Sequence, residues 1–590
     1  MPPASPTPDD TDPTDPNAGP ASRPAPGRVL LICPPFHDIT LSSLSTAQLA
    51  TWLRHQQVEC SEAYFHLQFA HLVGLERYRT LIHEGAAWTS ELLMAEALHG
   101  QLGDVEMQRR VRDLYGPATE RQALLQQFRT ICLGRVHDEQ PDVVGLSTSY
   151  NQLMASLWLA RAIKEDSPGI TVVLGGSACS EPMGTELLRA YPEVDHVVSG
   201  HGERPLLALA RGDAEPPRLI ESCAETDPDG APIPEYDPFL RELSTVNSDA
   251  RLALAFQSSR GCWWGRKHHC RFCGINGTQL EYHAKSERRV VREIRSLWEQ
   301  HGRNLFATDA IMSRLHLKQV VPELARFEDG PKIFYELKTN LTQAEVASLG
   351  RARIVGQLGV ESLSTRLLQL LRKGVSAITN LAVLKWCREH KVAVAWNLLC
   401  AIPGERIEDY DRQIELMKWI PHLPPPERVN PVRVDRFSPY FDAFRDYGWS
   451  DIEPFREYRS MHPHLDAAAL RAIAYHFNGV GGVSPDAYQN RLQSAVEHWR
   501  ERCRAGDGLF LDPQQGLVRN EDATGRRFNL EGPLGRIIEC THDIVPVRRV
   551  LAHARCTRSV LEQLAAHGLL FIEGDRAVNL TVRTQVPEDA

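Results

Sequence analysis

The sequence predicts an α/β protein with two regions of parallel sheet, one before and one after a loop that holds three cysteines. Short apolar runs such as RVLLICPPF (28–36) and ITVVLGGSA (170–178) alternate with helix-like stretches, which is typical of a doubly wound sheet. Beyond residue 304, further apolar or alternating segments are separated by helix-like stretches, which indicates successive β/α units. The sequence therefore favours two α/β domains in series.

Composition excludes several classes of protein. The chain has 590 residues, of which 42% are hydrophobic and 24% charged, so two to four domains are expected. A net charge of −9 gives no electrostatic footprint for nucleic acid. No apolar run approaches the roughly 20 residues of a membrane span. With thirteen cysteines and no export signal, we expect a cytoplasmic protein that binds neither nucleic acid nor membrane.

Composition and periodicity divide the chain into six segments. Pro- and Asp-rich stretches predict a tail and a linker, and changes of periodicity predict the other boundaries. The segments are a disordered tail (1–27), a Rossmann-like domain with a helical insertion (28–215), a linker (216–247), a partial (β/α)6 barrel (248–445), a helical segment (446–505) and a small winged-helix-like domain (506–590).

Three cysteines, Cys262, Cys270 and Cys273, have the spacing C-x7-C-x2-C. A cuboidal iron–sulfur cluster needs four ligands, so three thiolates would leave one iron open to bind a small molecule. Structural zinc is the alternative, because His268 or His269 could supply a fourth ligand. A disulfide is not expected, since three cysteines cannot pair evenly.

Polar residues end the strands predicted after the cysteine loop. Because active sites of parallel sheets and barrels lie at the carboxyl ends of the strands, we expect these residues to converge on one cavity. Taken singly, each could be a plain strand cap. They are Thr308–Asp309, Lys338–Asn340, Gly359–Glu361, Trp396–Asn397 and Asp435–Arg436.

The cysteine loop, together with GVESLS (359–364) and NLLCAIPGE (397–405), resembles the radical S-adenosylmethionine (SAM) superfamily. NLLCAIPGE is similar to the fifth-strand pattern of cobalamin-dependent members. The seven-residue gap between the first two cysteines matches a subgroup that matures RiPPs, which are ribosomally made peptides modified after translation. The resemblance implies a [4Fe–4S] cluster on the three cysteines, with SAM bound at its open iron.

The same resemblance implies a set of SAM contacts. Thr308 and Asp309 would contact the methionyl end, and Glu361 and Asn397 the ribose or carboxylate end. The full set is Phe272, Gly274, Thr308, Asp309, Lys338, Asn340, Glu361 and Asn397.

The first α/β region resembles the cobalamin-binding domain that precedes many radical SAM domains. LSTSYNQ (146–152), VVLGGSA (172–178) and VVSGHGE (197–203) carry this resemblance. The D-x-H-x-x-G motif is absent, which implies cobalamin held without a histidine lower ligand. A purely structural Rossmann sheet is the alternative. The implied contacts are Pro35, Phe36, Ser147, Thr148, Ser149, Gly175, Gly176, Ser177, Gly200, Gly202 and Glu203.

The resemblances together imply an activity. A 5′-deoxyadenosyl radical and methylcobalamin would methylate an unactivated sp3 carbon of a precursor peptide, with flavodoxin or ferredoxin as one-electron reductant. The winged-helix-like domain would bind the leader peptide at a sheet edge, or would be a scaffold that binds nothing. Alternatives are a non-methylating radical modification, such as cyclisation or thioether formation, or a cluster-carrying binding partner without turnover.

Overall fold

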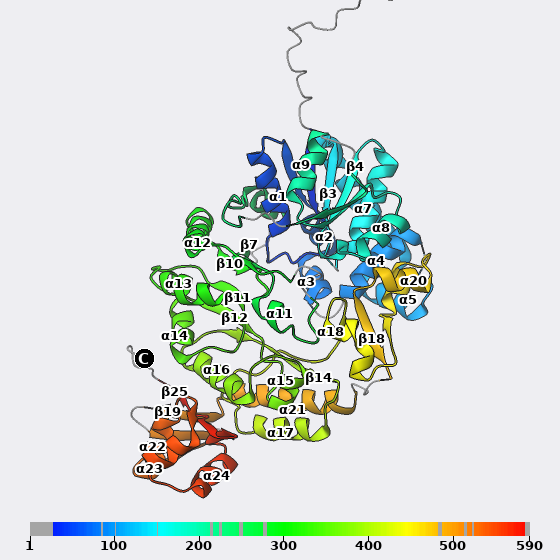
Figure 1. The fold of residues 1–590 in the computed structure, drawn as a ribbon. Coiled ribbons are helices and arrows are strands. Elements are labelled where there is room, and N and C mark those ends of the chain that lie inside the picture. Colours follow the sequence, from blue (N-terminus) through cyan, green and yellow to red (C-terminus); the bar gives the residue numbers. More distant parts are fainter. Residues whose placement is uncertain are drawn as a thin grey trace, which may run out of the picture.

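The computed structural model shows two parallel sheets followed by smaller mixed regions (Figure 1). The tail predicted over 1–27 lies outside the described residues except for Gly27. The structure describes residues 27–83, 87–100, 102–149, 151–212, 216–223, 227–246, 252–274, 280–481, 486–512, 516–521 and 524–584.

The first sheet has six parallel strands in the order β2-β1-β3-β4-β5-β6, which confirms the predicted doubly wound domain. Leu30 and Ile32 pack into one core, whereas Val29 and Leu31 pack into another on the opposite face. Both faces are therefore covered, as in other parallel sheets. The strands are β1 (Val29–Cys33), β2 (Cys60–Tyr64), β3 (Val143–Ser147), β4 (Thr171–Gly175), β5 (His196–Gly200) and β6 (Leu219–Ser222).

Helices cover the two faces of this sheet. Leu53 of α1 (Leu44–His55) and Leu206 of α9 (Glu203–Arg211) join the core of Val29, and α7 (Leu153–Asp166) joins the other core. The predicted helical insertion is present between β2 and β3. It comprises α2 (Phe65–Val73), α3 (Leu75–His83), α4 (Ala87–His99), α5 (Val105–Tyr115) and α6 (Ala118–Glu139).

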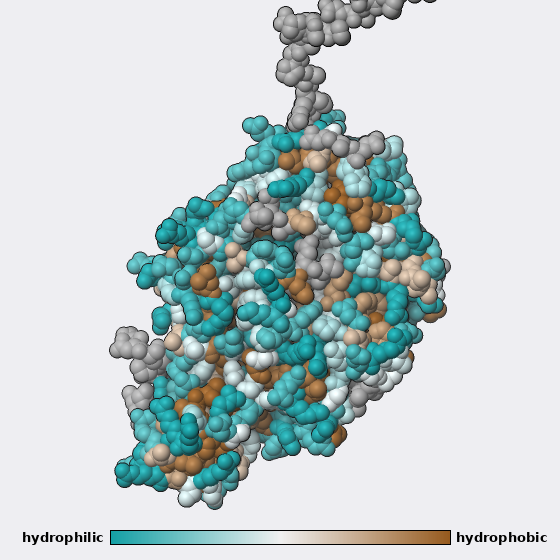
Figure 2. All heavy atoms as spheres, viewed as in Figure 1, coloured by the Kyte–Doolittle hydropathy of each residue, from teal (hydrophilic) through white to brown (hydrophobic). Residues whose placement is uncertain are grey.

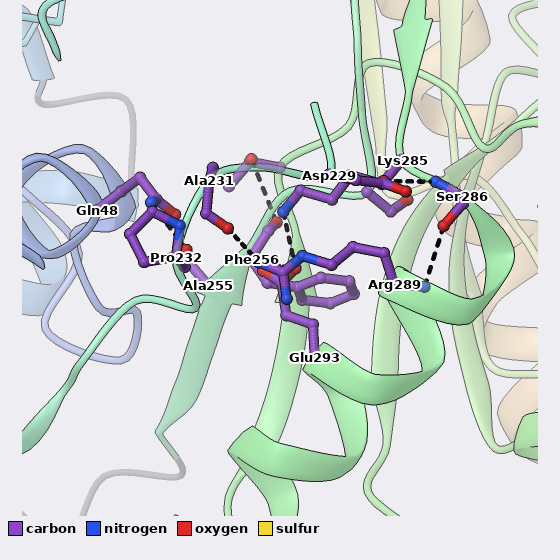
Figure 3. Close-up of polar contacts among 12 residues, drawn as sticks. Gln48, Asp229, Ala231, Pro232, Ala255, Phe256, Lys285, Ser286, Arg289 and Glu293 are labelled. Carbon is purple, nitrogen blue, oxygen red and sulfur yellow. Dashed lines mark hydrogen bonds and ion pairs between the residues drawn. The ribbon is translucent and has the colours of Figure 1, made fainter. Parts of the chain in front are cut away.

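The residues predicted as a linker contain regular structure. Strand β6 pairs with β5 and extends the first sheet past residue 215, and α10 (Asp237–Thr245) follows it. Between these elements a strap, residues 229–232, crosses to the second sheet (Figure 3). Gln48 of α1 donates to the Pro232 carbonyl at 3.0 Å, and Arg289 donates to the Ala231 carbonyl at 2.8 Å. The strap therefore joins both α/β regions.

The second sheet has five parallel strands in the order β13-β12-β11-β10-β7. Strand β14 follows β13 directly and forms a separate parallel pair with β15, so the β/α series continues past the sheet. Leu41, after β1, bridges Ala253 of β7, so the two sheets meet through backbone pairing. The strands are β7 (Ala253–Phe256), β10 (Asn304–Ala307), β11 (Ile333–Leu337), β12 (Ile354–Leu358), β13 (Val394–Ala395), β14 (Asn397–Cys400) and β15 (Arg428–Pro431).

The prediction of a helical segment over 446–505 is wrong in part. It includes β17 (Asp451–Pro454) and β18 (His476–Val480), which form an antiparallel sheet with β16 (Val434–Asp435). Strand propensity over so few residues is weak, and pairing with β16 decides the conformation. Gly479 allows close contact, since a Cβ there would lie 2.2 Å from Nε1 of Trp449. Helices α19 (Glu457–Met461), α20 (Ala467–Ile473) and α21 (Asp486–Ala505) complete the segment.

The C-terminal domain has the helix–strand–helix–helix–hairpin order of a winged helix. Lys385 of α16 (Ala377–Glu389) is buried against it and donates to the carbonyls of His542, at 2.6 Å, and Asn579, at 3.2 Å. Its elements are α22 (Pro533–Cys540), β22 (Val545–Pro546), α23 (Val547–Ala554), α24 (Arg558–Ala566), β23 (Leu570–Glu573) and β24 (Arg576–Asn579). A separate four-stranded sheet of this domain consists of β19 (Gly508–Asp512), β20 (Gly516–Glu521), β21 (Thr524–Phe528) and β25 (Val582–Arg583).

Polar and apolar residues are interspersed on the surface that Figure 2 shows. The hydrophobic residues in that view lie in several separate patches (Figure 2). Within the described ranges, no helix combines the length and the apolar character that crossing a membrane requires.

Candidate active site and cofactor cavity

A cavity of about 1600 Å³ lies where the carboxyl ends of both parallel sheets meet. Its lining includes Gly175 and Gly200 from the first sheet, and Thr308, Lys338 and Glu361 from the second. Pockets for one small ligand are typically about 300–1,000 Å³. The cavity is therefore large enough for more than one ligand.

The wall from the first sheet consists largely of backbone and hydroxyl groups. Gly176 has φ +122°, and a Cβ there would lie 2.2 Å from the Thr148 carbonyl oxygen, so only glycine fits. At Gly175 a Cβ would meet no protein atom within 4 Å, which leaves open space for a ligand. The predicted residues in this wall are Ser147, Thr148, Ser149, Gly175, Gly176, Ser177, Gly200, Gly202 and Glu203.

Pro35 and Phe36, predicted as cobalamin contacts, do not line this cavity, and their contact with cobalamin stays a prediction. Phe36 is 4% exposed and packs against Phe69 and Tyr78. Both partners belong to the helical insertion, whose apolar core buries the Phe36 ring. The loop that follows takes their place in the wall, with His37 and the serines that lead into α1. Burial lowers the pKa of His37, whose Nε2 lies 3.1 Å from the Leu41 carbonyl.

The serines of this loop were missed as site residues. Ser42, Ser43 and Ser45 line the cavity, and the Ser45 hydroxyl lies 3.0 Å from that of Ser147 on β3. The signal was the polar run TLSSLST (40–46) directly after the first strand, where a parallel sheet binds its ligands.

All three motif cysteines line the same cavity, on the loop between β8 (Ser259–Arg260) and β9 (His283–Ala284). The Cys262 thiol accepts a hydrogen bond from the Gly265 amide at 3.2 Å, and burial raises its pKa. All three are free thiols. Within the described ranges, no three His, Cys, Asp or Glu side chains are preassembled as a metal site. The donor set nevertheless suits a cluster, because thiolates are the usual ligands of iron–sulfur iron.

Asp309 anchors the start of the cysteine loop. It is 1% exposed, and its carboxylate accepts hydrogen bonds from the Ser258 amide at 2.8 Å and from the hydroxyls of Ser258, at 2.6 Å, and Ser259, at 2.5 Å. Burial raises the pKa of Asp309 despite these bonds. Asp309 therefore positions the loop besides lining the cavity beside Thr308.

Most of the other residues predicted to bind SAM line the cavity. At Gly274 a Cβ would lie 2.0 Å from the Arg436 carbonyl oxygen, so this contact requires glycine. The Asn397 amide oxygen is buried without a hydrogen-bond partner in the described part of the chain, so it can accept from a ligand. The residues in this wall are Phe272, Gly274, Thr308, Asp309, Lys338, Glu361 and Asn397.

Asn340, predicted as a SAM contact, lies outside the cavity, and its contact with SAM stays a prediction. After β11 the chain turns, so that Lys338 lines the cavity, Thr339 is buried and Asn340 is exposed. The Asn340 carbonyl accepts from Arg314 at 3.2 Å instead.

Charged groups concentrate beside the cysteine loop. Lys373, which was not predicted, forms an ion pair with Glu361 at 3.1 Å. The Lys338 ammonium lies 3.9 Å from the centre of the Trp264 ring, and burial lowers its pKa to about 8. Glu336 also lines the cavity, and burial, together with the charge of Glu361, raises its pKa to about 7.

A third part of the wall comes from the segment predicted as helical. Trp449, Phe455 and Phe477 supply aromatic rings there, and the carboxylate of Asp435, which was predicted, lies 2.7 Å from Nδ1 of His476. The three aromatic residues were missed because they lie on or next to β17 and β18, which were predicted as helix.

Family comparisons agree with this division of the cavity. The B12 binding domain family matches residues 128–210, and the Radical SAM superfamily matches residues 256–417. The first match covers β3, β4 and β5, and the second covers the cysteine loop and the strand ends through β14. The two matches confirm the predicted cofactor set of cobalamin, SAM and a [4Fe–4S] cluster.

Curated relatives are distant. An anaerobic magnesium-protoporphyrin IX monomethyl ester cyclase of Cereibacter sphaeroides is 21% identical over 373 residues, covering 57% of this chain and 58% of that protein. Hopanoid C-3 methylase of Methylococcus capsulatus is 27% identical over 349 residues, covering 53% and 64%. The chain thus spans less than two thirds of the length of either relative.

Solved structures show the same fold. The cobalamin-dependent SAM radical enzyme OxsB, solved with aqua-cobalamin and SAM bound, gives a TM-score of 0.53 at 13% identity, covering 80% of this chain and 66% of that one. The radical SAM methyltransferase TsrM from Kitasatospora setae, solved with cobalamin and a [4Fe–4S] cluster, gives 0.53 at 13% identity, covering 80% and 91%. The chain thus combines a B12 binding domain with a radical SAM domain, in the fold of cobalamin-dependent radical SAM enzymes.

Proposed function

We propose that this protein is a cobalamin-dependent radical SAM enzyme that methylates an unactivated sp3 carbon of a ribosomally made precursor peptide. The single observation that carries the proposal is the shared cavity. The glycine-ended strands of the B12 binding domain and the three cysteines of the radical SAM domain line one space. Two cofactors held there would reach the same substrate carbon.

The residues of the chain have distinct tasks in this proposal. Cys262, Cys270 and Cys273 would ligate the cluster, and Asp309 holds their loop through Ser258 and Ser259. The open backbone at Gly175 would receive one face of cobalamin. When bound, the cluster and SAM supply a carbon-centred radical oxidant, and cobalamin supplies a transferable methyl group.

Binding of SAM would use the charged wall. SAM carries an ammonium, a carboxylate and a sulfonium, and this wall offers Glu361, Lys373 and the unpartnered amide oxygen of Asn397. The strap that joins α1 to Arg289 links the two α/β regions that supply these walls (Figure 3).

A peptide substrate is supported by two features. The aromatic rings of Trp449, Phe455 and Phe477 form an apolar patch in the cavity wall, which suits a side chain whose target is a C–H bond. The winged-helix domain is fixed to the core by buried Lys385, so a leader peptide bound there would be held at a constant distance from the cavity. We place the enzyme in the cytoplasm, where its thiols stay reduced.

The test is anaerobic reconstitution with iron, sulfide and cobalamin, followed by SAM, reductant and a candidate peptide. Mass spectrometry should detect 5′-deoxyadenosine and S-adenosylhomocysteine, with a peptide heavier by one methylene unit. The Cys270→Ala variant is the matched control and should form neither nucleoside.

Other product patterns would decide against parts of the proposal. 5′-Deoxyadenosine without S-adenosylhomocysteine would indicate a non-methylating radical reaction such as cyclisation. An intact cluster with no cleavage of SAM would indicate a binding partner without turnover.

A further inference from the structure

The cysteine loop lines the cavity and has two chemically different faces. Its inner face carries the motif cysteines, which line the cavity. Its outer face carries Arg266, Lys267 and His268, which are exposed and do not line the cavity. The seven residues between the first two cysteines therefore place cations directly outside the proposed cluster site.

A rigid contact fixes this outer face. These residues lie on or next to the short helix α11 (Trp263–Lys267). The Trp264 indole donates to the Arg372 carbonyl at 3.1 Å, and a Cβ at Gly374 would lie 2.1 Å from the indole ring. This packing holds α11 against the turn 371–374. The same turn directs Lys373 into the cavity and leaves Arg372 exposed.

We call the exposed residues Arg266, Lys267, His268 and Arg372 the cationic loop face. None of its three Lys and Arg side chains forms an ion pair with a carboxylate of the described residues, whereas Lys373 and Arg433 in the cavity wall pair with Glu361 and Asp435. The acid that faces the neighbouring His269 is Asp442. Unpaired cations are notable here because the chain as a whole carries a net charge of −9.

We propose that the cationic loop face is the docking surface of an acidic one-electron carrier protein of the flavodoxin class. The inference rests on the proposed function, because it requires a cluster on the three cysteines. The carrier loses one electron and the cluster gains it, so no atom is transferred.

Charge and position both support this partner. An acidic carrier is attracted to exposed cations, and among these the cationic loop face lies on the loop that holds the proposed cluster ligands. The electron then crosses only the cysteine loop. The His268 ring packs against the Trp264 indole, with the ring centres 4.2 Å apart, which ties the face to the packed part of α11.

A stopped-flow experiment with the reconstituted full-length protein tests the inference. The probe is a flavodoxin in its fully reduced form, and the signal is bleaching of the cluster absorbance. In the double variant Arg266→Glu/Lys267→Glu, the second-order rate constant at low salt should fall by about tenfold or more. The difference should shrink at high salt, where the Debye length is about 3 Å.

Two controls make the result specific. Reduced methyl viologen, a cation, should reduce the cluster of the variant at least as fast as that of the wild type, which shows that the cluster is intact. The matched variant Arg288→Glu/Arg292→Glu changes the same charge on exposed residues of α12 (Glu287–His301), away from the loop, and should keep most of the wild-type rate.

Several outcomes would overturn the inference. An unchanged flavodoxin rate in Arg266→Glu/Lys267→Glu, or an equal loss in both double variants, would remove the docking role of this face. Loss of binding to single-stranded DNA with an unchanged flavodoxin rate would assign the face to nucleic acid instead. If wild-type protein holds no cluster that methyl viologen can reduce, the proposed function fails and the inference fails with it.

Discussion

The wall of the cavity that comes from the first sheet and the wall that comes from the cysteine loop face the same space but carry different groups. The first offers backbone at Gly175 and Gly176 and the hydroxyls of serines, with few charges. The second offers thiols and the paired charges of Lys373 and Glu361. A large, mainly neutral ring system suits the first wall, and a small charged ligand suits the second.

This difference teaches how one cavity can keep two cofactors apart. Shape and backbone select for one cofactor, whereas charge and metal ligation select for the other. A substitution in one wall should therefore affect one cofactor and spare its neighbour. The expectations below test that separation, from the largest effect to the smallest.

The largest effect is expected at the cluster ligands. Cys270→Ser should abolish the intact cluster and all formation of 5′-deoxyadenosine, because two thiolates cannot hold the cluster. Iron and sulfide analysis and product mass spectrometry measure both. Cobalamin retention should stay at the wild-type level. Loss of cobalamin in this variant would contradict the separation of the two walls.

In the first wall, Gly175→Leu should fill the space left for cobalamin. A side chain there meets no protein atom within 4 Å of its Cβ, so stability should change little. Cobalamin retained after gel filtration should fall by about tenfold or more, because a buried clash costs more than about 1.4 kcal/mol. Gly169→Leu, also open at its Cβ but outside the cavity, is the control. Retention equal to that of the control would show that cobalamin does not lie against this strand end.

In the second wall, Lys373→Met should weaken SAM binding and leave cobalamin bound. The substitution removes the partner of Glu361 at 3.1 Å and leaves a buried carboxylate unpaired. We expect the Kd for SAM to rise by about tenfold, since a lost charged hydrogen bond costs about 1.5–3 kcal/mol. Isothermal calorimetry measures it, with Lys373→Arg as the charge-conserving control. A Kd that is unchanged in Lys373→Met would remove this pair from the SAM site.

The smallest expected effect is that the affinity of the second wall for SAM depends on pH. Burial and the nearby Glu361 raise the pKa of Glu336 to about 7, so its carboxyl is neutral below that pH and ionised above it. A ligand with a sulfonium should therefore bind more tightly as the pH rises from 6 to 8, by about threefold for a screened charge. Glu336→Gln should remove this step. A step of equal size in the variant would assign the titration to another group.

Strand ends were predictable from the sequence, whereas the course of the loops after them was not. Gly175, Gly176 and Lys338 line the cavity as expected, because the end of the apolar run in the sequence marks the end of each strand. Asn340 lies only two residues further on and is exposed, since the chain has already turned. Phe36 is similarly buried by the helical insertion, which no local pattern positions.

Other parts of the site depend on contacts between distant segments. Lys373 belongs to no motif, and its pairing with Glu361 follows from the turn that Trp264 packs against. Strand β18 exists because it pairs with β16, about 40 residues earlier in the chain. Such pairings are set by tertiary structure, so the aromatic part of the wall could not be read from periodicity.

The central claim is that cobalamin and the cluster occupy one cavity. Electron paramagnetic resonance of the protein loaded with both, with cobalt as Co(II) and the cluster reduced by one electron, tests this claim directly. We expect the two spins to broaden and split each other's signals, because both sites line the same space of about 1600 Å³. Two signals that simply add, each identical to that of protein loaded with one cofactor, would contradict the shared cavity.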